Sequence, residues 1–570
     1  MDKRDVARAL EEIAVLLELK GENPFKIRAY ENAARAIDGL SEDLALVVES
    51  GRLTEIKGIG ENLARNITEL WKTGRLKFLD ELVDATPPGY LEMIRVPGLG
   101  AKRVRALGEE LEIASLAQLK AAAEGGRIRD LKGFGAQSEK KILEGIALIE
   151  QGAGRWLASD VRPVAERILA ALSRIPSVEH AEVGGSLRRW AETAKDVDLL
   201  VATRDPKRVT QEFLSLVPDA TLIASGDTKT SVRLPSRLAV DLRLVTPKEF
   251  PFALHYFTGS VAHNVRVRSR ALERGMSLNE YALSGKRHAS IRNEAELFRA
   301  VGLEYIEPEL REDRGEIEAA ETGGLPALIT LDDMRGILHC HTTSSDGKST
   351  LIEMAQAAQS WGASYLGIAD HSVSARYARG LSEADLKRQW TEIDRWNASS
   401  KKLRILKGAE VDILPDGTLD YPNRVLEKLD FAVASVHTNF TMNEKDMTQR
   451  VVRAIRNPYV GILAHPTGRL LLEREGFRLS LEEVFQAAAG EGVVVEINSN
   501  PHRLDLDWRE IRAARARGVR FAINPDAHHV SGYDDLRFGI GIARKGWLTK
   551  KDVINTLPAE KALALLRRRR

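Results

Sequence analysis

The sequence contains one cysteine, Cys340, in 570 residues, and no apolar run approaching the roughly 20 residues that a membrane helix needs. A single thiol excludes an intramolecular disulfide and a cysteine-based zinc finger. Any metal must therefore be held by His, Asp and Glu side chains. The stretch MDKRDVARALEE also lacks the apolar core of a signal peptide. We expect a cytoplasmic protein without a membrane partner.

The length and the changes of pattern along the chain predict several domains. Residues 1–150 are typical of short amphipathic helices, and residues from about 160 to 315 mix helices with alternating strands. An acidic stretch with Gly-Gly and Pro follows at 312–333. Beyond 335, seven short apolar runs each end in a polar cluster. This predicts a parallel β/α barrel or a near relative, with its active groups at the carboxyl ends of the strands.

A Gly-x-Gly pattern followed by a helix occurs three times in the helical part. One copy could merely join two helices, but three copies indicate that the motif has a function of its own. Glycine permits a positive φ in the turn, and the backbone N–H groups of the turn can then approach a phosphate closely. The segments resemble helix-hairpin-helix motifs, which implies a grip on the DNA backbone that is independent of sequence. The glycines concerned are Gly58, Gly60, Gly98, Gly100, Gly133 and Gly135.

Three carboxylates in the middle third predict a two-metal site. Asp196 and Asp198 in DVDLL point to the same face of a strand, and Asp241 lies in the alternating run LAVDLRLV. Crowded carboxylates repel one another unless cations neutralise them. Two Mg²⁺ or Mn²⁺ ions about 4 Å apart would align an attacking hydroxyl, a phosphate and a leaving pyrophosphate. The preceding GGSLRR offers a phosphate-approaching loop and arginines suited to phosphate oxygens.

The motifs GGSLRR, DVDLL, VDLRLV, HYFTGS and LNEYAL resemble, in order and spacing, the family X DNA polymerases of the polymerase beta type over residues 1 to about 310. The resemblance implies that Asp196, Asp198 and Asp241 are catalytic and bind the metals. It implies that the incoming deoxynucleoside triphosphate contacts Gly185, Ser186, Arg189, Tyr256, Phe257, Gly259 and Asn264. Arg268 matches a DNA-contacting arginine.

Two positions depart from that family. Where such polymerases carry the lysine that forms a Schiff base with an abasic sugar, this sequence has Asn66. An amide cannot be that nucleophile, so we do not expect a 5′-deoxyribose-phosphate lyase unless Lys72 or Lys26 substitutes. Ala239 stands where vertebrate members have an arginine beside the third aspartate.

Eight of the twelve histidines lie after position 335. A lone histidine is usually structural, but these follow successive predicted strand ends together with carboxylates. Nine candidate ligands exceed the roughly three protein ligands of one catalytic zinc, so two or three ions are expected. Mixed imidazole and carboxylate donors suit Zn²⁺ or Mn²⁺, and such a cluster hydrolyses phosphate esters. The candidates are His339, His341, Asp346, His371, Glu410, His437, His465, Asp526 and His528.

This run resembles the PHP domain from about 336 to 560. The resemblance implies one metal held by His339, His341, Glu410 and Asp526; a second by Glu410, His437 and His465; and a third by Asp346, His371 and His528. Glu410 would bridge the first two. Asn498 is adjacent and is expected to support a ligand or face the substrate.

The expected fold class is thus a multidomain α+β and α/β chain: a helix-hairpin-helix region, a polymerase beta-like palm and a C-terminal distorted β/α barrel. We expect domains at 1–85, 86–150, 151–250 and 251–315, a linker at 316–334 and the PHP domain at 335–570. The expected function is gap-filling repair synthesis with metal-dependent 3′-5′ trimming, by a nucleoid-associated monomer acting on gapped or nicked DNA. Alternatives are cleavage at abasic sites or of 3′-phosphates, a non-catalytic repair scaffold, and a small-molecule phosphatase.

Overall fold

The computed structural model describes residues 3–38, 40, 42, 44–94, 96, 99–152, 154–285 and 290–567. The chain divides into two compact units. The first comprises residues 1–153 with 472–474, and the second comprises 154–471 with 475–570. None of the helices in the described ranges combines the length and apolar character needed to cross a bilayer.

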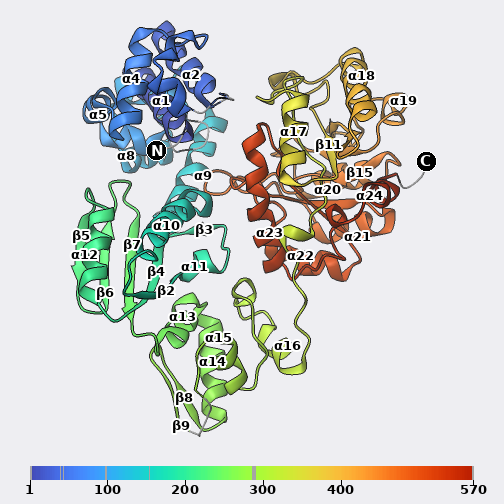
Figure 1. Cartoon of the computed structure of the whole chain (residues 1–570). Coiled ribbons are helices and arrows are strands. Elements are labelled where there is room, and N and C mark those ends of the chain that lie inside the picture. Colours follow the sequence, from blue (N-terminus) through green and yellow to red (C-terminus); the bar gives the residue numbers. More distant parts are fainter. Residues whose placement is uncertain are drawn as a thin grey trace. The chain divides into compact units, whose positions relative to one another are not determined.

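The described part of residues 1–153 is entirely helical (Figure 1, blue to cyan). Its helices follow the apolar spacing of the sequence: in α4, for example, Leu63, Ile67 and Leu70 recur at one face and are buried. They pack into one core that also contains Leu10 and Val104. The elements are α1 (Lys3–Leu19), α2 (Pro24–Asp38), α3 (Leu44–Glu49), η1 (Arg52–Glu55), α4 (Glu61–Thr73), α5 (Lys77–Asp84), α6 (Pro88–Met93), α7 (Ala101–Leu111), α8 (Leu116–Glu124) and α9 (Ala136–Gly152).

The second unit begins with a five-stranded sheet in the order β2-β4-β7-β6-β5. Val197, Leu199 and Val201 of β4 are buried in its core, as the alternation of the sequence predicts. Strands β4 and β7 are parallel neighbours, while the other pairs are antiparallel. The elements are β1 (Trp156–Leu157), α10 (Ala158–Leu172), β2 (Val178–Val183), α11 (Gly185–Arg188), β3 (Thr193–Ala194), β4 (Asp196–Thr203), α12 (Pro206–Leu216), β5 (Thr221–Ser225), β6 (Lys229–Arg233) and β7 (Ala239–Val245).

A smaller helical region follows the sheet and has its own core around Phe298. The segment 316–334, expected as a linker, is partly built into this core: Ile317 and Ala320, one helical turn apart in α16, are 4% and 2% exposed. The elements are α13 (Phe250–Thr258), α14 (Val261–Glu273), β8 (Met276–Leu278), β9 (Leu283–Gly285), α15 (Glu294–Ala300), η2 (Pro308–Leu310), α16 (Glu316–Thr322) and η3 (Leu331–Asp333).

Glu294 ties this helical region to α11, the helix between β2 and β3. It is 5% exposed and forms ion pairs with Arg188 at 2.6 Å and with Arg311 at 2.5 Å. Burial alone would raise its pKa, but Arg311 and Arg188 lower the pKa of the carboxyl to about 2. Its stabilising effect is therefore complete above the ordinary pKa range of glutamate and is lost as the pH falls toward 2.

Replacing Glu294 with Ala should lower the free energy of unfolding by about 3–5 kcal/mol, because two arginines lose their shared buried counter-charge. Denaturant unfolding at pH 7 measures the change. The matched control is Glu318→Ala, which breaks the exposed ion pair with Arg266 and should cost less than about 1 kcal/mol. Equal losses of unfolding free energy in the two variants would show that the buried ion pairs of Glu294 stabilise the protein no more than an exposed one.

The remaining residues form a parallel barrel surrounded by helices (Figure 1, yellow to red). Two sheets, β10-β11-β12 and β13 to β17, are linked by bridges between His371 and Glu410 and between Cys340 and Ala527, which close the ring. Apart from the two ends of β12, the strands are buried throughout their length, as expected where helices cover a parallel sheet. The expected fold class is confirmed.

The barrel strands are β10 (Gly336–Ile337), β11 (Tyr365–Ile368), β12 (Arg404–Lys407), β13 (Glu410–Asp412), β14 (Ala432–Ser435), β15 (Val460–Leu463), β16 (Val494–Asn498) and β17 (Phe521–Asn524). The helices are α17 (Leu351–Trp361), η4 (Arg376–Ala378), α18 (Glu383–Ser399), α19 (Asn423–Leu426), α20 (Glu444–Ile455), α21 (Leu481–Glu491), α22 (Trp508–Ala516), η5 (Val530–Asp535), α23 (Leu536–Lys545), η6 (Ile554–Thr556) and α24 (Ala559–Leu566).

Candidate functional site

The three palm carboxylates lie on two adjacent parallel strands. Asp196 and Asp198 are the first and third residues of β4, and Asp198 is in register with Asp241 of β7. Burial, followed by repulsion from Asp196 and Asp241, raises the pKa of Asp198 to about 6. Lys229 of β6 forms an ion pair with Asp241 at 2.7 Å. This oxygen-only donor set, in which the carboxylates repel one another, fits Mg²⁺ or Mn²⁺.

The glycine loop approaches this site so closely that one position excludes a side chain. Gly185 has φ +58°, and an added Cβ would lie 2.3 Å from Oδ2 of Asp198. The backbone N–H of Gly184 donates to the carbonyl oxygen of Asp198 at 2.8 Å. Ser186, Arg189 and Asp196 line one cavity of about 610 Å³. The structure thus brings the expected phosphate loop to the carboxylates.

Several residues expected to contact the incoming nucleotide line a second cavity, of about 310 Å³. Asn264 of α14 donates to the carbonyl oxygen of Tyr256 at 2.7 Å, and Phe257 packs edge-on against Tyr256. Arg189 and Arg268 line the same cavity, so Arg268 lies beside the nucleotide residues. The other expected nucleotide contacts that line it are Tyr256, Phe257, Gly259 and Asn264.

The hairpin glycines differ within each repeat. The first glycine has a positive φ, +96° at Gly58 and +88° at Gly133, whereas Gly98 lies outside the described residues. The second glycine does not: Gly60 and Gly100 are extended, with φ −86° and −79°. The second glycines, Gly60, Gly100 and Gly135, directly precede α4, α7 and α9. A Cβ added at any of them would have no atom of the described chain within 4 Å.

Asn66, at the position of the missing lysine, donates to the hydroxyl of Tyr30 at 2.8 Å. Lys26 pairs with Glu22 at 3.6 Å and lies 5.5 Å from the ring centroid of Phe78. None of these contacts prepares an amine nucleophile.

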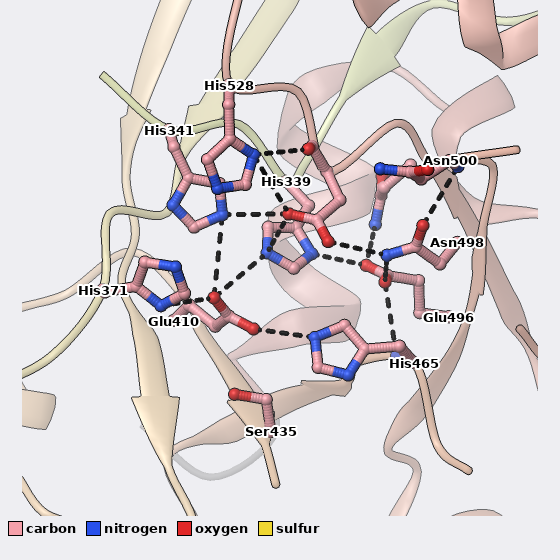
Figure 2. A network of polar contacts seen from close by, with 12 residues as sticks. His339, His341, His371, Glu410, Ser435, His465, Glu496, Asn498, Asn500 and His528 are labelled. Atoms are coloured by element: carbon pink, nitrogen blue, oxygen red, sulfur yellow. Dashed lines mark hydrogen bonds and ion pairs between the residues drawn. The ribbon is translucent and has the colours of Figure 1, made fainter. Parts of the chain in front are cut away.

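In the barrel, Glu410 is the centre of the histidine cluster (Figure 2). Its Oε2 lies 2.9 Å from Nδ1 of His371, and its Oε1 lies 2.9 Å from Nε2 of His465 and 3.2 Å from Nε2 of His437. The carboxylate is 1% exposed. Burial would raise its pKa, but His437, His371 and His339 hold the pKa well below its usual range. One carboxylate therefore offers both oxygens to different imidazoles, as a bridging ligand would.

Candidate ligand atoms lie within 4.8 Å of one another in three groups among the described residues, all in the barrel. The palm carboxylates are not so closely gathered. His341 belongs to two groups, and its Nε2 lies 3.1 Å from Oδ1 of Asp526. The groups are His339, His341 and Asp526; His371, Glu410 and His437; and His341, Asp346, His371 and His528. With His465 beside Glu410, the structure brings all nine expected ligands together.

The electrostatics of the cluster also fit divalent cations. Nε2 of His339 and Nδ1 of His341 are buried without a hydrogen-bond partner in the described chain. Burial, His528 and His371 lower the pKa of His341 to about 3. Burial opposes the charge on His371 as well, but Glu410 and Asp346 raise its pKa to about 11. Unpartnered buried nitrogens and carboxylates suit Zn²⁺ or Mn²⁺.

Two supporting carboxylates were missed by the sequence analysis. Glu496, fully buried on β16, lies 2.8 Å from Nδ1 of His339, and Asp412 of β13 lies 2.6 Å from Nδ1 of His437. Each orients a histidine so that Nε2 faces the cluster, as carboxylates behind metal-binding histidines do. A signal existed: Glu496 shares a strand face with Asn498, and Asp412 with Glu410.

Replacing Glu496 with Gln should weaken metal binding by about 10- to 100-fold, because the neutral amide orients and polarises His339 less well. Zn²⁺ titration of the metal-stripped protein measures it. Glu483→Gln, at an exposed position of α21, is the control. Unchanged affinity in Glu496→Gln would show that this carboxylate does not support His339.

Known protein families match the chain in four segments. These are a helix-hairpin-helix domain at residues 1–76, a SAM-like helix-hairpin-helix tandem at 90–147, the DNA polymerase beta thumb at 253–312 and the PHP domain at 338–500.

Individual relatives agree with this order. The chain is 39% identical over 573 residues to the DNA polymerase/3′-5′ exonuclease PolX of Bacillus subtilis (strain 168), a match that covers 100% of both proteins. A probable phosphatase of Thermoanaerobacter sp. (strain X514) is 30% identical over 232 residues, which is 38% of this chain and 89% of that protein. Because the first match runs over the full length and the thumb, hairpin and PHP segments accompany it, the chain belongs to the family X DNA polymerases that carry a C-terminal PHP domain.

Proposed function

We propose that this protein is a DNA-templated DNA polymerase that fills short gaps and that its barrel removes 3′-terminal nucleotides. The observation that carries the polymerase assignment is the register of Asp198 with Asp241 on adjacent strands, with Gly185 packed against Asp198. The relative from Bacillus subtilis, whose name states both activities, supports the pairing of functions.

In the polymerase centre, Asp196, Asp198 and Asp241 would hold two Mg²⁺ or Mn²⁺ ions. When bound, these ions supply the charge that activates the primer 3′-hydroxyl and stabilises the leaving pyrophosphate. Ser186 and Arg189 would bind the triphosphate oxygens, since guanidinium suits phosphate. Tyr256, Phe257 and Gly259 would face the sugar, and Asn264 the base. Arg268, in the same cavity, would contact the template.

In the barrel centre, the nine gathered ligands would hold two or three Zn²⁺ or Mn²⁺ ions. When bound, the ions supply a hydroxide and clamp the oxygens of a phosphodiester. Glu410 would be shared between ions, and Glu496 and Asp412 would keep His339 and His437 oriented. A DNA end tethered by the same chain meets this centre at high effective concentration, which favours DNA over a free metabolite as its substrate.

Defined 3′ ends test the substrate of the barrel. We expect the wild type with Mn²⁺ to shorten a duplex with a 3′-hydroxyl recessed end, and His339→Ala/His341→Ala to leave it intact. Faster release of phosphate from a 3′-phosphate end, or cleavage at an internal abasic site, would favour the alternative activities. Hydrolysis of p-nitrophenyl phosphate without any action on DNA would favour the small-molecule phosphatase.

The second glycine of each hairpin supplies the argument for DNA contact. Gly60, Gly100 and Gly135 have neither a positive φ nor a neighbour that a Cβ would meet in the described chain. The fold therefore does not explain why a side chain is absent there. Close approach of a phosphodiester to the N–H groups at the starts of α4, α7 and α9 would explain the absence of a side chain. Gly58 and Gly133, the first glycines with a positive φ, would shape the turns.

Replacing Gly60, Gly100 and Gly135 together with Ala should weaken binding to gapped duplex by about a hundredfold, at about 1 kcal/mol for each of the three lost backbone contacts. Fluorescence anisotropy measures it on two unrelated sequences, which should suffer equally. Gly490→Ala, at a glycine outside the hairpins that likewise has no positive φ and no described neighbour within 4 Å of an added Cβ, is the control. Unchanged affinity in the triple variant would contradict DNA contact at these turns.

We also propose domain boundaries and an oligomeric state for the protein. We place helical domains at 1–85 and 86–150, the palm at 151–250, the nucleotide-selecting region at 251–315 and the PHP domain at 335–570, with 316–334 connecting them. We also propose that the protein acts as a nucleoid-associated monomer on gapped or nicked DNA, which light scattering with and without DNA tests.

A further inference from the structure

A buried lysine of the barrel domain reaches the polymerase part of the second unit. Lys545, the last residue of α23, has 1% of its side chain exposed. Its Nζ forms an ion pair with Oε1 of Glu312, donates to the carbonyl oxygen of Arg189 at 3.2 Å, and lies 4.5 Å from the ring centroid of Trp508. A buried ammonium without a counter-charge would be costly, so this position is built around the pair with Glu312.

Glu312 is shared between two cations. The same oxygen, Oε1, also accepts from Nε of Arg189 at 2.9 Å. Nη1 of Arg189 donates to the carbonyl oxygen of Thr258 at 2.6 Å, so the guanidinium is fixed on two sides. Glu312 is the last residue of the matched thumb segment, and Lys545 belongs to the barrel. Three segments far apart in sequence therefore meet at one carboxylate oxygen.

The cavity beside Arg189 is walled from both domains. Ser186, Arg189 and Asp196 face it from the palm, and Trp508, Arg509 and Lys545 face it from the barrel. Its lining carries five cations, Arg155, Arg189, Lys195, Arg509 and Lys545, against three anions, Glu192, Asp196 and Glu312. A cavity of about 610 Å³ with this excess of positive charge suits a polyphosphate.

We propose that Lys545 of the PHP domain is a positioning residue of the polymerase centre, which neutralises Glu312 and so keeps Arg189 available for the triphosphate of the incoming nucleotide. The inference rests on the proposed role of Arg189 in holding that triphosphate. It assigns to the barrel domain a part in nucleotide binding that is separate from its own hydrolysis.

The charges of Glu312, Arg189 and the triphosphate predict that loss of Lys545 weakens nucleotide binding. Glu312 and a triphosphate are both anions that compete for Arg189. While Lys545 neutralises Glu312, the carboxylate orients Arg189 without holding it strongly. Without Lys545, the remaining ion pair between Glu312 and Arg189 tightens and one cation is lost from the cavity wall, so both changes disfavour the nucleotide.

Steady-state incorporation on a one-nucleotide gap tests this with the full chain. We expect Lys545→Met to raise KM for the nucleotide about tenfold, the equivalent of one charge-assisted hydrogen bond, with kcat and the exonuclease rate nearly unchanged. Glu312→Gln should not raise KM. The double variant should return KM to near the wild-type value, because Lys545 acts through Glu312. Lys545→Arg should retain most of the affinity, and Lys550→Met, an exposed lysine nearby in sequence, is the control.

Each outcome decides between the two proposals. If Arg189→Ala raises KM but Lys545→Met does not, the coupling is overturned while the role of Arg189 stands. If the double variant keeps the full defect of Lys545→Met, Lys545 does not act through Glu312 and the inference fails. If Arg189→Ala leaves KM unchanged, the proposed role of Arg189 fails and the inference with it. Equal losses of extension and exonuclease in Lys545→Met and Lys545→Arg would show a purely structural residue, which also overturns it.

Discussion

Replacing Asp198 with Asn should lower the rate of nucleotide incorporation about a thousandfold or more while leaving 3′-end shortening intact. The amide keeps the shape of the side chain but removes one negative charge from a site whose function is to hold two cations. Asp198 is the carboxylate most affected by its neighbours: burial, Asp196 and Asp241 raise its pKa to about 6.

Single-turnover extension of a primer on a one-nucleotide gap measures this loss. Asp219→Asn is the matched control, because Asp219 is an exposed aspartate of the same domain. This variant should extend the primer at the wild-type rate. Extension by Asp198→Asn within tenfold of wild type would contradict the two-metal assignment.

Replacing Glu410 with Gln should abolish 3′-5′ shortening, by about a thousandfold or more, and should also reduce the metal content of the protein. Glu410 contacts His371, His437 and His465 through both oxygens at 2.9–3.2 Å. A neutral amide offers one acceptor and one donor, so it cannot bridge cations as a carboxylate does.

Elemental analysis and a shortening assay on the same preparation test both parts of this expectation. Glu427→Gln, an exposed glutamate of the barrel domain, is the control and should retain metal and activity. Full activity in Glu410→Gln would place the hydrolytic centre elsewhere. Loss of activity with full metal content would mean that Glu410 acts on the substrate rather than as a ligand.

Much of both sites could be predicted because short-range periodicity places side chains reliably. Asp196 and Asp198 share a face of β4 two residues apart. His339 and His341 follow β10 on either side of the bridging residue Cys340, and both point to Glu410. Apart from Glu410, the first residue of β13, the barrel ligands follow strand ends, which parallel topology gathers at one edge.

The remainder depends on contacts that no local pattern reveals. Glu496 meets His339 across 157 residues of sequence, and Lys545 meets Glu312 across 233. The position of His341 between two ligand groups also follows from how the barrel closes, through the bridge of Cys340 to Ala527. The stretch after 312 resembled a linker because it is acidic and contains Gly-Gly and Pro, whereas the structure uses Ile317 and Ala320 as core residues.

The most direct test of the central claim, that one chain carries two independent centres, is a single assay on a one-nucleotide-gapped duplex with Mn²⁺, with and without nucleotides. It compares the wild type with Asp196→Ala/Asp198→Ala and His339→Ala/His341→Ala. We predict that the aspartate variant loses only extension and the histidine variant loses only shortening. Shortening that survives the histidine changes, or a wild type that never extends the primer, would contradict the claim.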